Sequence, residues 1–174
     1  VIEAEIDPKS YILGPGDKLG LSIITSANMS YVLTIAPTGD LWIPDVGSIH
    51  ISGLDIKSSE VKVAQYIHKN KYKYADITLI LLNIRHFKIQ VIGAVLNPGF
   101  VTISSVDRLT DIIRKSGGLH KLADEDNILL SRADDKMIKC SLKSFRLDGD
   151  IHNNPVIEDG NVVHVPYDHK YNEE

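Results

Sequence analysis

The chain has 174 residues, of which 43% are hydrophobic and 24% are charged. This composition is ordinary for a globular protein and leaves room for one large domain or two small ones. The net charge of −4 argues against a nucleic-acid partner, because phosphate-binding domains are usually basic, and no apolar run reaches the roughly 18 residues of a membrane-spanning helix. Cys140 is the single cysteine, which excludes an intramolecular disulfide, and its alternating neighbours predict a small buried side chain.

The first half of the chain is predicted to begin with a turn and a strand. The turn consists of Gly14, Pro15, Gly16 and Asp17. Proline fixes φ, glycine permits positive φ, and an aspartate side chain bonds to nearby backbone. Apolar side chains then occupy alternate positions over 19–24, which predicts a strand with one buried face. Shorter strands are expected over 31–36, 41–43 and 48–51.

A helix and a closing strand are predicted next. The helix is expected over 58–69, with either Asp55 or Ser58 as its N-cap. Helical spacing predicts an apolar face made of Val61, Ala64, Ile67 and His68. The segment 76–84 contains a nearly continuous apolar run rich in β-forming residues, so we expect a strand that is buried on both faces.

The second half of the chain is predicted to be a strand hairpin, one helix and further strands. Residues 87–91 and 100–103 are expected to pair through a turn at Asn97, Pro98 and Gly99. The helix begins near Asp107 and ends at Gly117 and Gly118, either of which can hold the positive φ of a C-cap. Its buried stripe is Leu109, Ile112 and Ile113. The remaining strands are expected over 128–131, 136–141 and 162–165, the first two joined by a turn at 133–135. This order of elements is typical of the β-grasp fold.

A weak internal repeat links the two halves. Gly160 and Asn161 precede an alternating strand, as Gly16 and Asp17 do. Asparagine keeps the side-chain acceptor and loses the charge, so we expect the same turn at both places. Residues 1–10 and 167–174 are expected to be flexible ends.

Candidate catalytic and metal-binding residues are few. His164 and His169 are close in sequence, but one lies in a predicted strand and the other in the tail. His120, Asp124 and Asp126 share a loop but lack the spacing of a calcium-binding EF-hand. No zinc-protease, nucleophile-elbow or dinucleotide-binding motif occurs, so no catalytic residue, metal or cofactor is expected.

Aromatic side chains are the candidates for contact with carbohydrate, because sugar rings stack on aromatic faces. Trp42 is the single tryptophan, and its position between Leu41 and Ile43 in a predicted strand favours packing in the core over sugar binding. A cluster near the end of the first helix is expected either to contact polymer or a neighbouring subunit, or to be ordinary surface; it consists of Tyr66, Tyr72 and Tyr74.

Six segments resemble, in order, the motifs of a known family. Residues 11–23, 38–47 and 51–54 resemble the motifs of the polysaccharide biosynthesis/export family. Residues 91–100, 109–119 and 156–166 resemble the start, helix and last turn of the soluble-ligand-binding β-grasp (SLBB) module. The motif positions predicted to form turns are Gly14, Pro15, Gly16, Asp17, Gly39, Pro44, Gly47, Gly53, Pro98, Gly99, Gly117, Gly118, Gly160, Asn161 and Pro166.

The resemblance implies an α+β protein of two small modules, an N-terminal export domain over 11–85 and an SLBB β-grasp domain over 86–166. It implies a component of capsular polysaccharide or exopolysaccharide export in the periplasm, associated with the bacterial outer membrane, and not an enzyme. Any signal or lipid-anchor segment would lie outside these residues. The implied partners are the polysaccharide, further copies in a homo-oligomeric ring, and an inner-membrane chain-length regulator or copolymerase, with no nucleic acid.

Two other interpretations remain open from the sequence. The first is a soluble carbohydrate- or ligand-binding β-grasp module without a transport pore. The second is a small hydrolase acting on surface polysaccharide, which needs two carboxylates facing a sugar across a cleft. The 23 acidic residues make any single pair uninformative.

Overall fold

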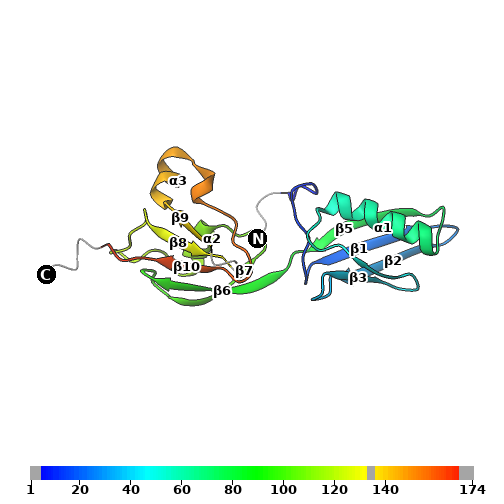
Figure 1. The fold of residues 1–174 in the computed structure, drawn as a ribbon, viewed down its shortest axis with the longest axis horizontal. Helices are drawn as coiled ribbons and strands as arrows, with labels where there is room; N and C mark the ends of the chain where they lie inside the picture. Colours follow the sequence, from blue (N-terminus) through cyan, green and yellow to red (C-terminus); the bar gives the residue numbers. More distant parts are fainter. Residues whose placement is uncertain (1–4, 133–135, 169–174) are drawn as a thin grey trace. The chain divides into compact units, whose positions relative to one another are not determined.

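The computed structural model describes residues 5–132 and 136–168, and Figure 1 shows its fold. The chain divides into two compact units, Val1–Arg85 and His86–Glu174. Both mix helices with strands, which confirms the predicted α+β class. In the described part of the chain, no helix has the length and apolar character needed to traverse a bilayer.

The first unit contains a three-stranded antiparallel sheet. Strand β1 (Lys18–Ile24) lies in its centre, between β2 (Asn28–Thr34) and β5 (Asp76–Asn83). The alternation expected in β1 is present, since Leu19, Leu21 and Ile23 are almost fully buried. These side chains form the centre of the unit's core.

Helix α1 (Ile56–Asn70) packs against β5. Asp55 is the N-cap, and its Oδ1 accepts a hydrogen bond of 2.8 Å from the Ser58 amide. The predicted apolar face is partly wrong, because Val61 is 50% exposed while Val63 and Ile67 are buried. Val61 lies two residues before Val63, about 200° around the helix, and therefore points away from the core.

Strand β5 is not buried on both faces, contrary to the expectation from its apolar run. Leu79 is buried, but Ile80 and Leu82 are 51% and 49% exposed. The helix covers one face of this sheet, and side chains alternate across a strand, so every second residue of β5 faces outward.

A separate hairpin completes the first unit. It consists of β3 (Asp40–Ile43) and β4 (Gly47–His50), paired in antiparallel register. Leu41 and Ile43 are buried, whereas Trp42 between them is 66% exposed. The expectation that Trp42 packs in the core is therefore wrong. In a strand, the residue between two buried neighbours points to the opposite face.

The second unit contains a five-stranded mixed sheet. Its order is β7 (Gly99–Ser104), β6 (His86–Gly93), β10 (Val162–Val165), β8 (Ile128–Ser131) and β9 (Met137–Cys140). Strand β10 is parallel to β6 and antiparallel to β8. Helix α2 (Leu109–Lys115) buries the predicted stripe of Leu109, Ile112 and Ile113, and Cys140 is buried in the same core.

Two short helical segments between β9 and β10 were not expected. They are α3 (Leu142–Asp148) and the 3₁₀ turn η1 (Ile151–Asn153). Ser141 caps α3 by accepting from the Ser144 amide, and Gly149 ends it with φ of 69°. A serine at the N-cap followed by a glycine at the C-cap is the sequence signal that indicates this helix.

The expected turn between β8 and β9 and the expected flexible C-terminal end have different outcomes. The predicted turn at 133–135 lies outside the described residues. Tyr167 and Asp168 belong to the expected flexible end, yet Tyr167 bridges Ala123 and the Asp168 amide donates to the Leu122 carbonyl at 2.8 Å.

Candidate functional site

The first predicted motif forms a buried polar cluster around Asp17. This side chain has no exposed surface. Its Oδ2 accepts a 2.8 Å hydrogen bond from the Gly14 amide, which closes the turn, and its Oδ1 accepts one of 2.8 Å from the Tyr11 hydroxyl. A buried carboxylate needs such partners, and it also needs a cation.

Arg85 supplies that cation from the last residue of the first unit. Its Nη1 lies 2.8 Å from Asp17 Oδ2, and its backbone amide donates to Asp17 Oδ1 at 2.7 Å. A Cβ at Gly14 would lie 2.8 Å from the guanidinium carbon, so the glycine leaves room for the arginine. The motif therefore fastens the beginning of the unit to its end.

The second unit repeats this turn without the ion pair. Asn161 is 2% exposed, and its Oδ1 accepts a 2.9 Å hydrogen bond from the Glu158 amide. Its own amide donates to the Glu158 carbonyl at 3.1 Å, as that of Asp17 does to Gly14. The expected turn with asparagine in place of aspartate is present.

Most of the predicted turn glycines have a backbone that favours glycine. Positive φ occurs at Gly16, Gly39, Gly47, Gly53, Gly99, Gly117, Gly118 and Gly160. Of the motif prolines, Pro166 accepts a hydrogen bond of 2.8 Å from the Asp124 amide, while Pro44 lies in the β3–β4 turn and Pro98 precedes β7. These positions shape the fold and do not gather into one cavity.

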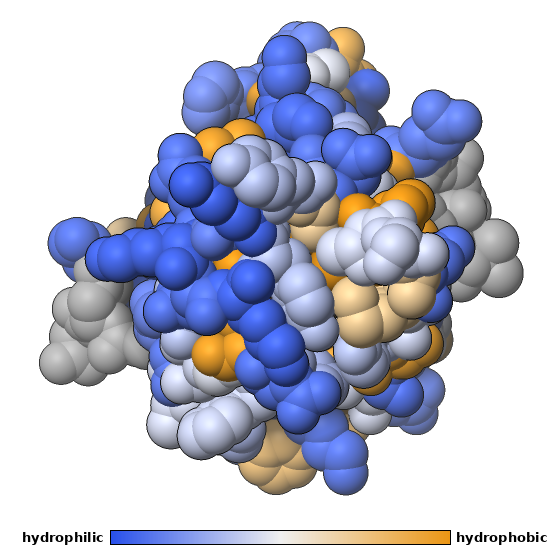
Figure 2. Space-filling view, turned by 90° about the vertical axis from the view of Figure 1, so that its right-hand side faces the viewer, coloured by the Kyte–Doolittle hydropathy of each residue, from blue (hydrophilic) through white to orange (hydrophobic). Residues whose placement is uncertain are grey.

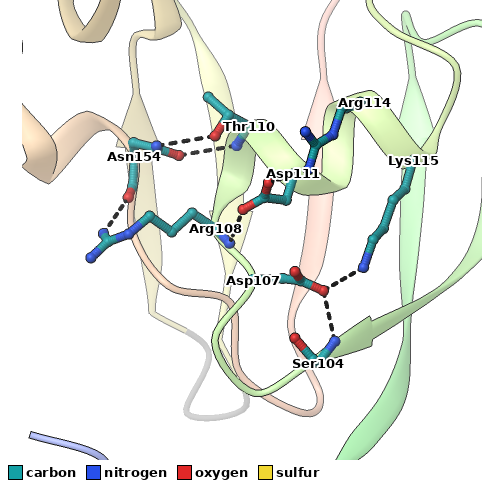
Figure 3. A network of polar contacts seen from close by, with 8 residues as sticks. All are labelled: Ser104, Asp107, Arg108, Thr110, Asp111, Arg114, Lys115 and Asn154. Carbon is teal, nitrogen blue, oxygen red and sulfur yellow. Dashed lines mark hydrogen bonds and ion pairs between the residues drawn. The ribbon is translucent and has the colours of Figure 1, made fainter. Parts of the chain in front are cut away.

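A second polar network surrounds the beginning of α2 (Figure 3). Asn154 is 3% exposed and bonds twice to Thr110, through Oδ1 to the amide and through Nδ2 to the hydroxyl. Arg108 donates from Nη1 to the Asn154 carbonyl at 2.8 Å. The network ties the helix to the loop after η1. The role of Asn154 was not predicted, because an isolated asparagine in a loop gives no signal of its distant partner.

Asp107 belongs to the same network. Its Oδ2 lies 2.7 Å from the Ser104 amide and 2.5 Å from Lys115 Nζ. Burial raises the pKa of Asp107, but the hydrogen bonds from Lys115 and Ser104 outweigh it, so that the pKa lies below its ordinary value. Asp107 is therefore ionised at neutral pH and links the last residue of β7 to the last residue of α2.

The three candidate tyrosines do not form one platform. Tyr66 turns its hydroxyl towards Gly47, where a Cβ would lie 2.6 Å from it. Tyr72 donates its hydroxyl to Met29 Sδ at 3.7 Å, and only Tyr74 among the three is strongly exposed, at 88%. Their role in contacting polymer or a subunit stays a prediction.

The exposed face of the β3–β4 hairpin does gather polar groups around an aromatic ring. Asp40 and Trp42 share this face, and His50 is the cross-strand neighbour of Asp40. Asp40 accepts from the Thr38 hydroxyl at 2.7 Å and contacts His50 Nδ1 at 3.1 Å. The Thr38 hydrogen bond, followed by that of His50, lowers the pKa of Asp40, which is therefore a carboxylate at neutral pH.

The residues considered as metal ligands have local partners. His120 Nδ1 accepts from the Leu122 amide, Asp124 binds the side-chain amide of Asn127, and Asp126 accepts from the Ser141 hydroxyl. Within residues 5–132 and 136–168, no three histidine, cysteine or acidic side chains are grouped to hold a metal ion. His169 lies outside the described residues.

A groove in the first unit has a volume of about 630 Å³. It runs beside β5 and the first turn of α1 and is lined by Glu5, Ile6, Pro8 and Glu60, among others. Glu60 closes part of the strand edge, since its Oε2 accepts from the Leu79 amide at 3.1 Å. Figure 2 views the right-hand side of Figure 1, where hydrophobic surface is broken into small areas by hydrophilic residues.

Comparison with known proteins finds a matching family model for each half of the chain. The model of the polysaccharide biosynthesis/export protein matches residues 5–82, and the model of the SLBB domain matches residues 87–165. The two matches together cover nearly the whole chain and support a polysaccharide export family protein with an SLBB module, as the sequence motifs predicted. This is a family of export proteins and not of enzymes.

Two curated proteins with the same name are similar to this chain. They are polysialic acid transport proteins KpsD of Escherichia coli, 23% and 22% identical to this chain over 162 residues. The similarity covers 92% of this chain and 29% of each relative, so the chain spans less than a third of their length.

Proposed function

We propose that this chain takes part in the export of capsular polysaccharide or exopolysaccharide. The observation that carries the proposal is the succession of an export domain and an SLBB domain over nearly the whole chain. The transport proteins to which it is similar align with 92% of this chain and are longer than it. The polar clusters around Asp17 and Asn154 hold turns and helices together within each unit, so neither is assigned a catalytic role.

The finer proposal concerns place and assembly. The chain acts in the periplasm at the outer membrane, as part of a homo-oligomeric conduit that receives polymer from an inner-membrane chain-length regulator. Family membership supports this arrangement. The protein then acts by guiding polymer, and no bond is made or broken by it.

The test is deletion of the encoding gene in its host, with polysaccharide measured separately at the surface and inside the envelope. We expect loss from the surface and accumulation in the periplasm, both reversed by a full-length copy of the gene. A copy carrying Asp17→Ala, which damages the fold of the first unit, is expected not to restore export.

The contrary outcome is unchanged surface polymer in a host without a second exporter. That result would overturn the proposal and favour the soluble carbohydrate- or ligand-binding module. Sustained cleavage of polysaccharide by purified protein, abolished by one carboxylate substitution, would instead favour the hydrolase.

A further inference from the structure

The exposed tryptophan of the β3–β4 hairpin is the side chain that the fold explains least. A tryptophan is usually well buried, because its ring contributes a large apolar area. Trp42 is 66% exposed, and the core contacts of β3 are made by its neighbours Leu41 and Ile43. Removing the indole would therefore cost the core little, which leaves recognition as a role for it.

Hydrogen-bonding groups surround this ring. The register places Ser48 opposite Trp42 and His50 opposite Asp40, so four side chains share the outer face of the hairpin. Thr38 extends the group by donating its hydroxyl to Asp40. We name this set, Thr38, Asp40, Trp42, Ser48 and His50, the Trp42 surface. It combines one flat apolar plate with a carboxylate, an imidazole and hydroxyls.

Side chains of α1 and of its C-cap residue contact the hairpin. Lys62 of α1 donates from Nζ to the His50 carbonyl at 2.7 Å, and the Tyr66 hydroxyl lies against Gly47. Lys71 Nζ lies 4.0 Å from Asp45 in the β3–β4 turn. A site on rigid elements loses little conformational freedom when it binds a ligand.

We propose that the Trp42 surface binds an uncharged pyranose unit of the polysaccharide. This inference rests on the proposed export function and names a contact point for the polymer. The C–H face of a pyranose stacks on the indole, while its equatorial hydroxyls reach Asp40 and His50. The carboxylate of Asp40 accepts hydrogen bonds from sugar hydroxyls and repels an acidic sugar, so the bound unit is uncharged.

Other occupants fit this surface less well. A protein partner would bury Trp42 beside apolar neighbours, but the neighbours on this face are polar. A lipid surface would have to desolvate the Asp40 carboxylate, which is costly. A sugar has an apolar face and a polar rim, and this matches the arrangement of the Trp42 surface.

The test uses the fluorescence of Trp42, the single tryptophan of the chain. Oligosaccharides cut from the host's surface polymer are titrated into the 174-residue chain, with maltoheptaose as a neutral reference and oligosialic acid as an acidic one. We expect a saturable change in emission with the host and neutral oligosaccharides, and none with oligosialic acid. By calorimetry, Trp42→Ala is expected to weaken binding at least about tenfold.

The matched control is Phe100→Ala, which removes another strongly exposed aromatic ring, from the second unit, and is expected to leave the affinity unchanged. Far-UV circular dichroism and melting temperature check that both variants fold. The proposal is overturned if Trp42 emission shows no saturable change with the host oligosaccharides, or if Trp42→Ala binds them as well as the unsubstituted chain. It is also overturned if the emission shifts with protein concentration alone, which would assign the surface to contacts between copies.

The two proposals fail in different experiments. If gene deletion leaves surface polymer unchanged, the export function is wrong whatever the binding result. If deletion abolishes surface polymer while the Trp42 surface fails the fluorescence and calorimetry tests, export stands and only the sugar contact is wrong.

Discussion

Arg85 Nη1 lies 2.8 Å from Asp17 Oδ2, although the two residues are 68 positions apart in the chain. The carboxylate is fully buried, while 26% of the arginine side chain is exposed. The motif at residues 14–17 therefore forms both a local turn and a long-range ion pair. We call the ion pair between Asp17 and Arg85 the clasp. The corresponding turn at Asn161 uses a neutral side chain and makes its hydrogen bond to Glu158.

The clasp predicts an unequal response to the loss of either partner. Arg85→Met leaves a buried carboxylate without its cation, so we expect a loss of about 3 kcal/mol in the free energy of unfolding of the first unit. Asp17→Asn keeps an acceptor for the Gly14 amide and is expected to cost less. Urea denaturation followed by circular dichroism measures both changes.

The double variant is the control for this interpretation. With both charges removed, Asp17→Asn with Arg85→Met should be more stable than Arg85→Met alone, because no buried charge is left unpaired. Equal or lower stability of the double variant would show that the arginine acts through packing rather than through its charge.

The glycine pair after α2 gives a second prediction. Both Gly117 and Gly118 have positive φ, at 84° and 101°. A Cβ at Gly117 would lie 2.4 Å from Asn97 Nδ2, whereas nothing lies within 4 Å of one at Gly118. We expect Gly117→Ala to cost about 1–3 kcal/mol, from strain plus this close contact. Gly118→Ala should cost about 1 kcal/mol from strain alone.

The melting temperature of the second unit, followed by the loss of its NMR signals on heating, is compared between the two variants. The structure predicts that Gly117→Ala lowers it more than Gly118→Ala does. If Gly118→Ala were the more damaging substitution, the contact with Asn97 would not be the source of the cost.

Much of the fold could be predicted from local patterns. Alternation predicted β1 and the buried Cys140, and helical spacing predicted the buried stripe of α2, because each depends on side chains close together in the sequence. The turn at Asn161 was predicted by analogy with Asp17 for the same reason. Local geometry was sufficient for these elements, whereas the outward position of Val61 and the helix α3 were missed although their signals are also local.

Other errors concern relationships that are distant in sequence. The apolar run in β5 did not reveal that one of its faces is left uncovered, and Trp42 looked like a core residue because its neighbours are apolar. The partners Arg85 of Asp17 and Asn154 of Thr110 come from far along the chain. The Trp42 surface exists only once β3 and β4 are paired.

The third prediction concerns the stability of the second unit at acid pH, which depends on the ionisation of Asp107. Burial raises the pKa of this carboxyl, and the hydrogen bonds from Lys115 and Ser104 lower it further than burial raises it. A carboxyl whose pKa is depressed by folding stabilises the folded state above its unfolded pKa. This contribution is lost as the pH falls below the ordinary value of 3.8 and through the lower folded value.

The measurement is the free energy of unfolding of the second unit between neutral pH and pH 2. We expect Asp107→Asn to flatten its fall in the acid range and to lower stability at neutral pH. Asp148→Asn, which removes a carboxylate from an exposed position at the end of α3, is the matched control and should leave the slope unchanged. A slope unaltered by Asp107→Asn would mean that its hydrogen bonds do not favour the ionised form.

Neighbouring residues of β5 give the fourth prediction, because the strand is covered on one face only. Leu79 is 2% exposed and Ile80 is 51% exposed, although both belong to the same apolar run. Leu79→Ala should destabilise the first unit by about 2–5 kcal/mol, since it opens a cavity in the core. Ile80→Ser should change stability by less than about 0.5 kcal/mol, as expected for a surface position. Urea denaturation measures both, and comparable losses would show that a further layer covers the outer face of β5 in solution.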